Sequence, residues 1–205
     1  KDAATGGPMA SRRRGISIFG AAAGLSVAGL PFTRGAAAAG EASMFTWEGY
    51  ALGAESTITL AHYSREGAER IVDLAVAEIR RLEQIFSLKI ADSELSVLNR
   101  DGRLSRPSYD MLALLTEAKR YGEMSDGAFD PTVQPLWTLY RGHFRANPDS
   151  KTGPSLDEID QALRLVDYRR LDVNPLFVRL DRDGMQLTLN GIAQGYITDK
   201  VSDLF

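Results

Sequence analysis

The feature that most constrains this chain is a long apolar stripe between residues 71 and 86. Its members recur at spacings of three and four: Ile71, Ala75, Ile79, Leu82 and Phe86. That spacing places them on one face of a helix, and Ser64 is suited to cap the start of this helix. Because a helix with one apolar face must bury it, the stripe predicts a folded domain with a core rather than a disordered chain.

The elements around this helix follow from similar local signals. Alternating apolar and polar residues predict a strand at 56–61. A second helix is predicted at 108–124, with Leu112, Leu115 and Ala118 facing inward. A third helix is predicted to start at Ser155, where Ser-Leu-Asp-Glu fits a capping box. Its apolar stripe consists of Leu156, Ile159 and Leu163.

A hairpin is predicted near the carboxyl end. Apolar residues alternate on both sides of Asp183-Gly184, which indicates a tight turn with a return strand at 185–189. The return strand leads into residues 190–196, where a further helix is expected to begin. Helices interspersed with strands in this way predict an α+β fold.

Charge and composition exclude several classes of function. The net charge is −3 overall and +4 over residues 1–39, which leaves −7 on the remainder. Such an acidic body repels phosphate backbones, so nucleic-acid binding is not expected. The chain has no cysteine and two histidines, His62 and His143. Disulfides and thiolate metal sites are therefore excluded, and a histidine-built zinc site is not expected.

Residues 1–39 have the pattern of an export signal. Three arginines at 12–14 precede an apolar stretch at 16–30, and small residues follow at 36–39. That order is typical of a cleavable signal, and the arginines resemble a twin-arginine signal read by that export machinery. The alternative is an uncleaved membrane anchor. We expect cleavage near Gly40, a periplasmic location, and one folded domain at 40–205 behind the amino-terminal extension.

The first loop that could carry chemistry is 127–133, Gly-Ala-Phe-Asp-Pro-Thr-Val. Gly127 is suited to end the second helix. Asp130 is held extended because Pro131 follows it, and its carboxylate could accept hydrogen bonds from an amide or a ribose hydroxyl of a ligand. The alternative is a turn aspartate that bonds only to nearby backbone N–H groups.

The second such loop is 190–195, Asn-Gly-Ile-Ala-Gln-Gly. A strand that runs through small residues into a helix presents N–H groups suited to an anion such as a pyrophosphate. Gly191 lets the backbone approach a ligand or offer its carbonyl to a cation. The alternative is tight strand–helix packing. The Rossmann, P-loop, nucleophile-elbow and zinc-protease motifs are absent.

Four blocks of sequence together resemble one family. Residues 52–54 resemble the family's Met-Gly-Thr, and residues 86–99 resemble its Phe-Ser followed by Ser-Glu-Leu-Ser-x-Leu-Asn. Residues 127–133 resemble its Gly-x-Phe-Asp-Pro-Thr-Val, and residues 188–195 resemble its Asp-Leu-Gly-Gly-Ile-Ala-Lys-Gly. In this order, they resemble the FAD:protein FMN transferases, the ApbE family. Residues 189–199 are most similar to the NosX branch, which is associated with nitrous oxide respiration.

The resemblance implies a fold and an activity. The fold would be one α+β domain with mixed sheets and packed helices, here without its carboxyl-terminal end. The family's enzymes bind FAD and Mg²⁺, move FMN onto a threonine hydroxyl of a membrane or exported redox protein, and release AMP. The branch suggests an acceptor among the membrane flavoproteins of nitrous oxide respiration.

The resemblance also implies site residues. Seven are expected to contact FAD: Leu52, Lys89, Ala128, Phe129, Asp130, Thr188 and Gln194. The carbonyl of Gly191 would be one cation ligand, and an Asp and a Thr beyond Phe205 would supply the others. No residue qualifies as a general base, so the catalytic residue stays unassigned.

Three positions depart from the family pattern. Thr188 stands where the family usually has Asp, Gln194 where it often has Lys, and Lys89 near a tyrosine thought to pack on the flavin. These departures keep other functions open: a non-catalytic FAD carrier or chaperone, an FAD pyrophosphatase, and a structural partner of a respiratory complex.

Overall fold

The computed structural model describes residues 16–21, 42–51 and 54–204 of the protein. The chain divides into two compact units. The first comprises Lys1–Val76 and Ser202–Phe205, and the second comprises Ala77–Val201. Among the described residues, no helix is both long and apolar enough to span a membrane.

The first unit contains a three-stranded sheet in the order β1-β3-β2. Its strands are β1 (Ile16–Ala21), β2 (Ser43–Ala51) and β3 (Ala54–His62). β2 runs antiparallel to β3 and β1 runs parallel to it. The strand predicted at 56–61 is confirmed, because Ile58 and Leu60 are buried and the intervening Thr59 is half-exposed. β1 consists of residues from the predicted export signal, whose other residues lie outside the described part of the chain.

The long helix α1 (Arg65–Phe86) confirms the apolar stripe. Ser64 caps it, since its hydroxyl accepts a hydrogen bond from the N–H of Gly67 at 3.1 Å. Four residues of the predicted face are buried: Ala75, Ile79, Leu82 and Phe86. Ile71 is only half-buried, and its neighbour Val72 is buried instead.

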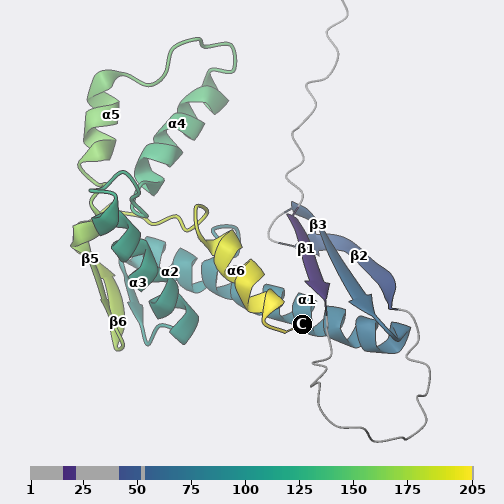
Figure 1. Ribbon diagram of the computed structural model, residues 1–205. Helices are drawn as coiled ribbons and strands as arrows, with labels where there is room; N and C mark the ends of the chain where they lie inside the picture. Colours follow the sequence, from purple (N-terminus) through teal and green to yellow (C-terminus); the bar gives the residue numbers. More distant parts are fainter. Residues whose placement is uncertain (1–15, 22–41, 52–53, 205) are drawn as a thin grey trace, which may run out of the picture. The chain divides into compact units, whose positions relative to one another are not determined.

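Five further helices belong wholly or largely to the second unit (Figure 1). They are α2 (Glu94–Asp101), α3 (Tyr109–Met124), α4 (Gln134–Ala146), α5 (Leu156–Leu163) and α6 (Ala193–Ser202). The serine hydroxyls of Ser93, Ser108 and Ser155 cap α2, α3 and α5, and the capping box predicted at Ser155 is present. A short 3₁₀ helix, η1 (Tyr168–Arg170), follows α5.

The sheet of the second unit has the order β4-β6-β5 and is antiparallel. Its strands are β4 (Arg103–Ser105), β5 (Leu171–Asn174) and β6 (Phe177–Leu180). α3 lies against β5 (Figure 1). The buried residues of this unit include Leu98, Leu115, Leu171 and Val178. Helices combined with small sheets confirm the predicted α+β class.

The hairpin predicted across Asp183-Gly184 is wrong. The turn itself forms, with the N–H of Met185 donating to the carbonyl of Arg182 at 3.2 Å. Residues 185–189, however, do not pair with β6, because β4 and β5 already occupy both edges of that strand. The alternation that suggested a strand instead reflects the burial of three side chains: Met185, Leu187 and Leu189.

The pair of helices α4 and α5 differs from the rest of the second unit. The two helices contact each other, and neither has a buried residue (Figure 1). The stripe predicted to lie inward on α5 is therefore open, with Leu156 79% exposed and Leu163 45% exposed.

Candidate functional site

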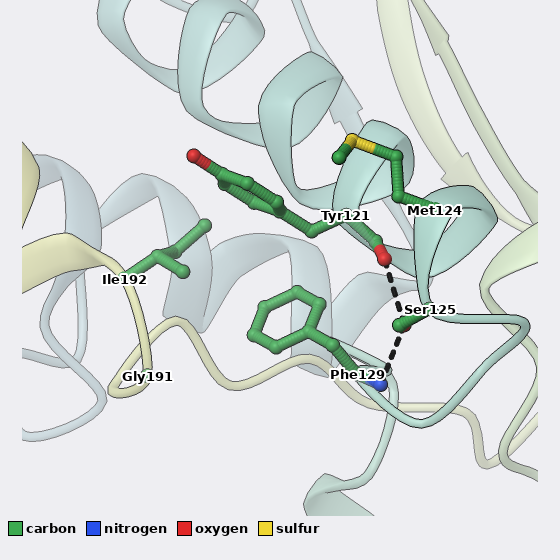
Figure 2. A pocket seen from close by; sticks show the side chains of 6 residues that line it. All are labelled: Tyr121, Met124, Ser125, Phe129, Gly191 and Ile192. Atoms are coloured by element: carbon green, nitrogen blue, oxygen red, sulfur yellow. Dashed lines mark hydrogen bonds between the residues drawn. The ribbon is translucent and has the colours of Figure 1, made fainter.

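An apolar pocket of about 440 Å³ lies in the second unit. Its wall comes from the end of α3, the loop that follows, and the loop that precedes α6 (Figure 2). Six residues line it: Tyr121, Met124, Ser125, Phe129, Gly191 and Ile192. The pocket thus joins the two loops that the sequence singled out.

The end of α3 is shaped so that Phe129 faces the pocket. The hydroxyl of Ser125 donates to the carbonyl of Tyr121 at 2.7 Å and accepts from the N–H of Phe129 at 2.9 Å (Figure 2). The helix ends earlier than the glycine predicted, because its C-cap is Ser125 and Asp126 takes the left-handed position with a φ of 49°. Gly127 follows with a φ of 82°, and its N–H donates to the carbonyl of Gly122 at 2.8 Å. The ring of Phe129 consequently meets that of Tyr121 edge to face, with centroids 6.1 Å apart.

The carboxylate of Asp130 is engaged by the protein itself. One oxygen accepts from the N–H and the hydroxyl of Thr132, at 2.7 and 2.6 Å, and the other accepts from the N–H of Tyr168 at 2.9 Å. The hydroxyl of Thr132 in turn accepts from the N–H of Asp167 at 2.8 Å. Asp130 is therefore a turn aspartate, which was the alternative left open by the sequence, and it also accepts a hydrogen bond from the backbone of η1. A contact between Asp130 and FAD stays a prediction.

The two predicted loops come together. The N–H of Thr188 donates to the carbonyl of Pro131 at 2.8 Å, which joins the segments directly. A methyl group at Gly191 would lie 3.3 Å from a ring carbon of Phe129, closer than ordinary van der Waals contact. Glycine at 191 therefore lets the aromatic ring pack against the backbone.

The other predicted site residues occupy different places. Thr188 is buried, and its hydroxyl accepts from the N–H of Asn190 at 3.4 Å. Ala128, Gln194 and Lys89 are exposed, and none of the three is among the residues that line the pocket. Leu52 lies outside the described residues. Their contacts with FAD stay predictions.

Several pocket residues escaped the sequence analysis. Tyr121 and Met124 are large apolar side chains that stay exposed near the end of α3. Their position just before the Gly-Ala-Phe-Asp turn is a sequence signal that could have identified them.

Asn99 lies inside the motif at 86–99, but the sequence alone indicated no role for it. Its side-chain amide donates to the carbonyl of Leu187 at 2.8 Å and accepts from the N–H of the same residue at 2.6 Å, which holds residues 185–189 in place.

The described residues do not form a metal site by themselves. Over residues 16–21, 42–51 and 54–204, no three histidine or acidic side chains are grouped so that they could hold a metal ion. The exposed backbone at Gly191 could offer one carbonyl oxygen. A single carbonyl does not make a magnesium site, so this part of the chain does not fit Mg²⁺ by itself.

A family model described as "ApbE family" matches residues 52–205. The chain belongs to the ApbE family. The resemblance drawn from the sequence motifs is thereby confirmed, while membership of the NosX branch stays a prediction.

Two curated relatives of this ApbE-family chain carry the name FAD:protein FMN transferase. That of Treponema pallidum (strain Nichols) is 30% identical over 135 residues, which are 62% of this chain and 36% of the relative. That of Klebsiella pneumoniae (strain 342) is 28% identical over 167 residues, which are 78% of this chain and 49% of the relative. The chain thus spans half or less of the length of these relatives.

Solved structures of ApbE proteins share the fold. The flavin transferase ApbE from Vibrio cholerae superposes with a TM-score of 0.68 at 22% identity, over 79% of this chain and 53% of that one. The ApbE protein of Thermotoga maritima gives a TM-score of 0.67 at 25% identity, over 79% and 52%. The predicted ApbE-like α+β fold is confirmed by these likenesses.

Proposed function

We propose that this protein transfers FMN from FAD to a threonine hydroxyl of an acceptor redox protein and releases AMP. The observation that carries the proposal is the junction of the Phe129 and Gly191 loops around one apolar pocket. Membership of the ApbE family and relatives named FAD:protein FMN transferase support the reaction class.

The pocket suits one end of a dinucleotide. Its volume lies in the range of ligand sites of roughly 300–1,000 Å³. The side chains of Tyr121, Phe129 and Ile192 point toward a common space and offer apolar surface to a planar ring (Figure 2). Backbone N–H groups at the start of α6 are suited to the adjoining phosphates, because helix N-termini attract anions.

The reaction balances as a phosphoryl transfer. The threonine oxygen bonds to the phosphorus on the flavin side, the bond from that phosphorus to the bridging oxygen breaks, and AMP leaves with the bridging oxygen. The hydroxyl proton passes to a base that the described residues do not identify. Donors fixed at the start of α6 would stabilise the negative charge that develops on the phosphate oxygens.

We also propose that the reaction depends on Mg²⁺. The family resemblance makes the Gly191 carbonyl one ligand and puts the other ligands beyond Phe205. A bound divalent cation would polarise the phosphoryl group. Removing divalent cations with EDTA is expected to abolish transfer, and adding Mg²⁺ is expected to restore it; transfer that continues in EDTA would contradict the dependence.

The proposed location is the periplasm, after export by the twin-arginine route and cleavage near Gly40. The arginines at 12–14, the short apolar stretch and the small residues that follow support it. An acceptor among the membrane flavoproteins of nitrous oxide respiration would fit the NosX-like residues 189–199. Amino-terminal sequencing of periplasmic protein tests the cleavage, and a chain that began at Met9 would contradict it.

The decisive experiment incubates the protein with FAD, Mg²⁺ and an acceptor. Transfer predicts flavin fluorescence that stays on the acceptor after denaturation, AMP in equal amount, and no labelling when the acceptor threonine is replaced by valine. The departures from the family pattern at Thr188 and Gln194 are the reason to test the alternative functions in the same experiment. AMP and free FMN without acceptor would indicate a pyrophosphatase, and stoichiometric FAD binding without AMP would indicate a carrier. No FAD binding at all would favour a structural partner of a respiratory complex.

A further inference from the structure

Within the second unit, residues from three helices meet at one buried carboxylate. Asp110, in the first turn of α3, is only 8% exposed. One of its oxygens accepts a hydrogen bond from the hydroxyl of Tyr196 on α6 at 2.7 Å. The other oxygen lies 2.8 Å from a guanidinium nitrogen of Arg81 on α1. Arg81 is itself held by two hydrogen bonds of 2.8 Å to Glu78.

This cluster connects the two walls of the pocket. Tyr196 lies one helical turn after Ile192, and its N–H donates to the Ile192 carbonyl at 3.1 Å. Ile192 comes directly before α6, so a change in the position of α6 at Tyr196 would move Ile192 through this backbone bond. The opposite end of α3 carries Tyr121 and Met124, which form the facing wall.

The ring of Tyr196 is also held from the side. Phe86, the last residue of α1, meets it edge to face with centroids 5.7 Å apart. The hydroxyl therefore lies at the end of a ring that has little freedom to turn. Its hydrogen bond to Asp110 sets how α6 is rotated relative to α3.

We infer that Tyr196 and Asp110 are positioning residues for the proposed flavin pocket, because their hydrogen bond holds Gly191 and Ile192 opposite Phe129 and Tyr121. The inference rests on the proposed function for its ligand. It does not make either residue catalytic, since neither lines the pocket.

Electrostatics supports a positioning role. Burial raises the pKa of the Tyr196 hydroxyl above its ordinary value, and the hydrogen bond to Asp110 raises it further. Burial also acts to raise the pKa of Asp110, but hydrogen bonds from Tyr196 and Arg81 outweigh it and leave that pKa below its usual value. At neutral pH the pair is a protonated donor and an ionised acceptor, a strong type of hydrogen bond. A tyrosine acting as a base would need a lowered pKa instead.

The surrounding titratable groups leave that state unchanged near neutrality. They are Glu78 and Arg81 on α1, Tyr109 on α3 and Lys200 on α6. The two cations favour the ionised form of Asp110. A positioning role therefore predicts that removing the Tyr196 hydroxyl changes the level of the pH–rate profile of transfer but not its shape.

The test compares Tyr196→Phe and Asp110→Asn with Tyr109→Phe as the matched control, because Tyr109 is 77% exposed on the same helix as Asp110. Tyr196→Phe keeps the ring and its contact with Phe86. We expect it to weaken FAD binding and raise the KM for FAD by about tenfold, the size of one lost hydrogen bond to a charged group, with kcat within about twofold. Asp110→Asn is expected to weaken FAD binding similarly, and combining the two substitutions is expected to add little. The control is expected to match wild type.

Hydrogen–deuterium exchange gives a readout that needs no flavin. Peptides covering residues 189–196 are expected to exchange faster in Tyr196→Phe and Asp110→Asn, but not in Tyr109→Phe. If wild type fails to bind FAD while exchange responds in this way, the proposed function fails and the positioning of the loop stands. Unchanged exchange, unchanged FAD affinity of the folded variants, or loss of one limb of the pH–rate profile in Tyr196→Phe would each overturn the inference.

Discussion

Two groups of motif residues in the second unit behave in opposite ways. The side chains of Asn99, Asp130 and Thr132 turn toward the protein and bond to the backbone of distant segments. Ala128, Gly191 and Gln194 are exposed, and of these Gly191 lines the pocket. The comparison teaches that a polar motif residue can serve the architecture, and that the motif residues left exposed are the ones to test for a role in binding.

The largest effect should come from breaking the first group at Asn99. Asn99→Ala leaves the N–H and the carbonyl of buried Leu187 without their side-chain partner. We expect the free energy of unfolding to fall by about 2–4 kcal/mol, since an unsatisfied buried polar group costs about 1–3 kcal/mol. Urea denaturation measures this loss.

Asn147→Ala is the matched control for that experiment. Asn147 is exposed, and its amide bonds only to the carbonyl of His143 in its own helix. Its replacement should cost no more than about 0.5 kcal/mol, as for most surface changes. Equal losses of unfolding free energy in the two variants would show that the Asn99 contacts do not stabilise residues 185–189.

The next largest effect is expected at Asp130, another residue of the group that bonds to the protein itself. Asp130→Asn keeps one acceptor but turns an NH₂ group toward one of the N–H donors that the carboxylate now satisfies. We expect unfolding to become easier by about 1–3 kcal/mol, for the same reason as above. Urea denaturation measures the change.

Thr132→Val separates the two roles open to Asp130. This change removes the hydroxyl that links Asp130 to Asp167, but it keeps the carboxylate and its two backbone N–H donors. If Asp130 acts only through the loop, both variants should weaken FAD binding alike when calorimetry is run on folded protein. A much greater loss in Asp130→Asn alone would confirm the predicted contact with FAD.

Local signals predicted most of the helices and one strand. Ser64, Ser108 and Ser155 each mark a helix start, because each hydroxyl accepts a hydrogen bond from the N–H three residues ahead. The α+β class followed from these elements. The two loops that form the pocket were also singled out, each with a structural alternative: a turn aspartate at Asp130 and tight strand–helix packing at Gly191.

What the sequence missed is non-local. Whether residues 185–189 pair with β6 depends on β4 and β5, which compete for the same edges. The Asn99–Leu187 contact spans 88 positions and the Tyr196–Asp110 bond spans 86. No local pattern marks such pairs. The carboxylate of Asp130 was ambiguous for the same reason, because its partner Tyr168 lies in another segment.

Among the exposed motif residues, Gly191 gives the sharpest test, with a smaller expected effect than at Asn99 or Asp130. Gly191→Ala places a methyl group 3.3 Å from the Phe129 ring, so that ring must shift by a few tenths of an ångström. We expect FAD affinity to fall about three- to tenfold, corresponding to about 0.7–1.4 kcal/mol of binding free energy. Unfolding should change by less than about 1 kcal/mol, because the residue is exposed.

Gly195→Ala is the control for this change, since nothing lies within 4 Å of its added methyl group. It should leave FAD affinity intact and stabilise α6 by up to about 1 kcal/mol, the helix preference of alanine over glycine. Isothermal titration with FAD and thermal melting measure the two effects. Equal affinity losses in both variants would mean that the Phe129–Gly191 contact does not shape the site.

The smallest effect is expected at Gln194, the exposed departure from the family pattern. Gln194→Lys adds a cation in the first turn of α6, where the pyrophosphate is proposed to bind. The gain in FAD affinity should be about two- to threefold, because an exposed charge pair contributes about 0.2–1 kcal/mol. Raising the ionic strength should erase most of it, whereas the affinity lost in Gly191→Ala should persist, since contact with a ring is not screened by salt. A gain that survives high salt would mean that the lysine acts by packing, and no gain at low salt would place the phosphates away from α6.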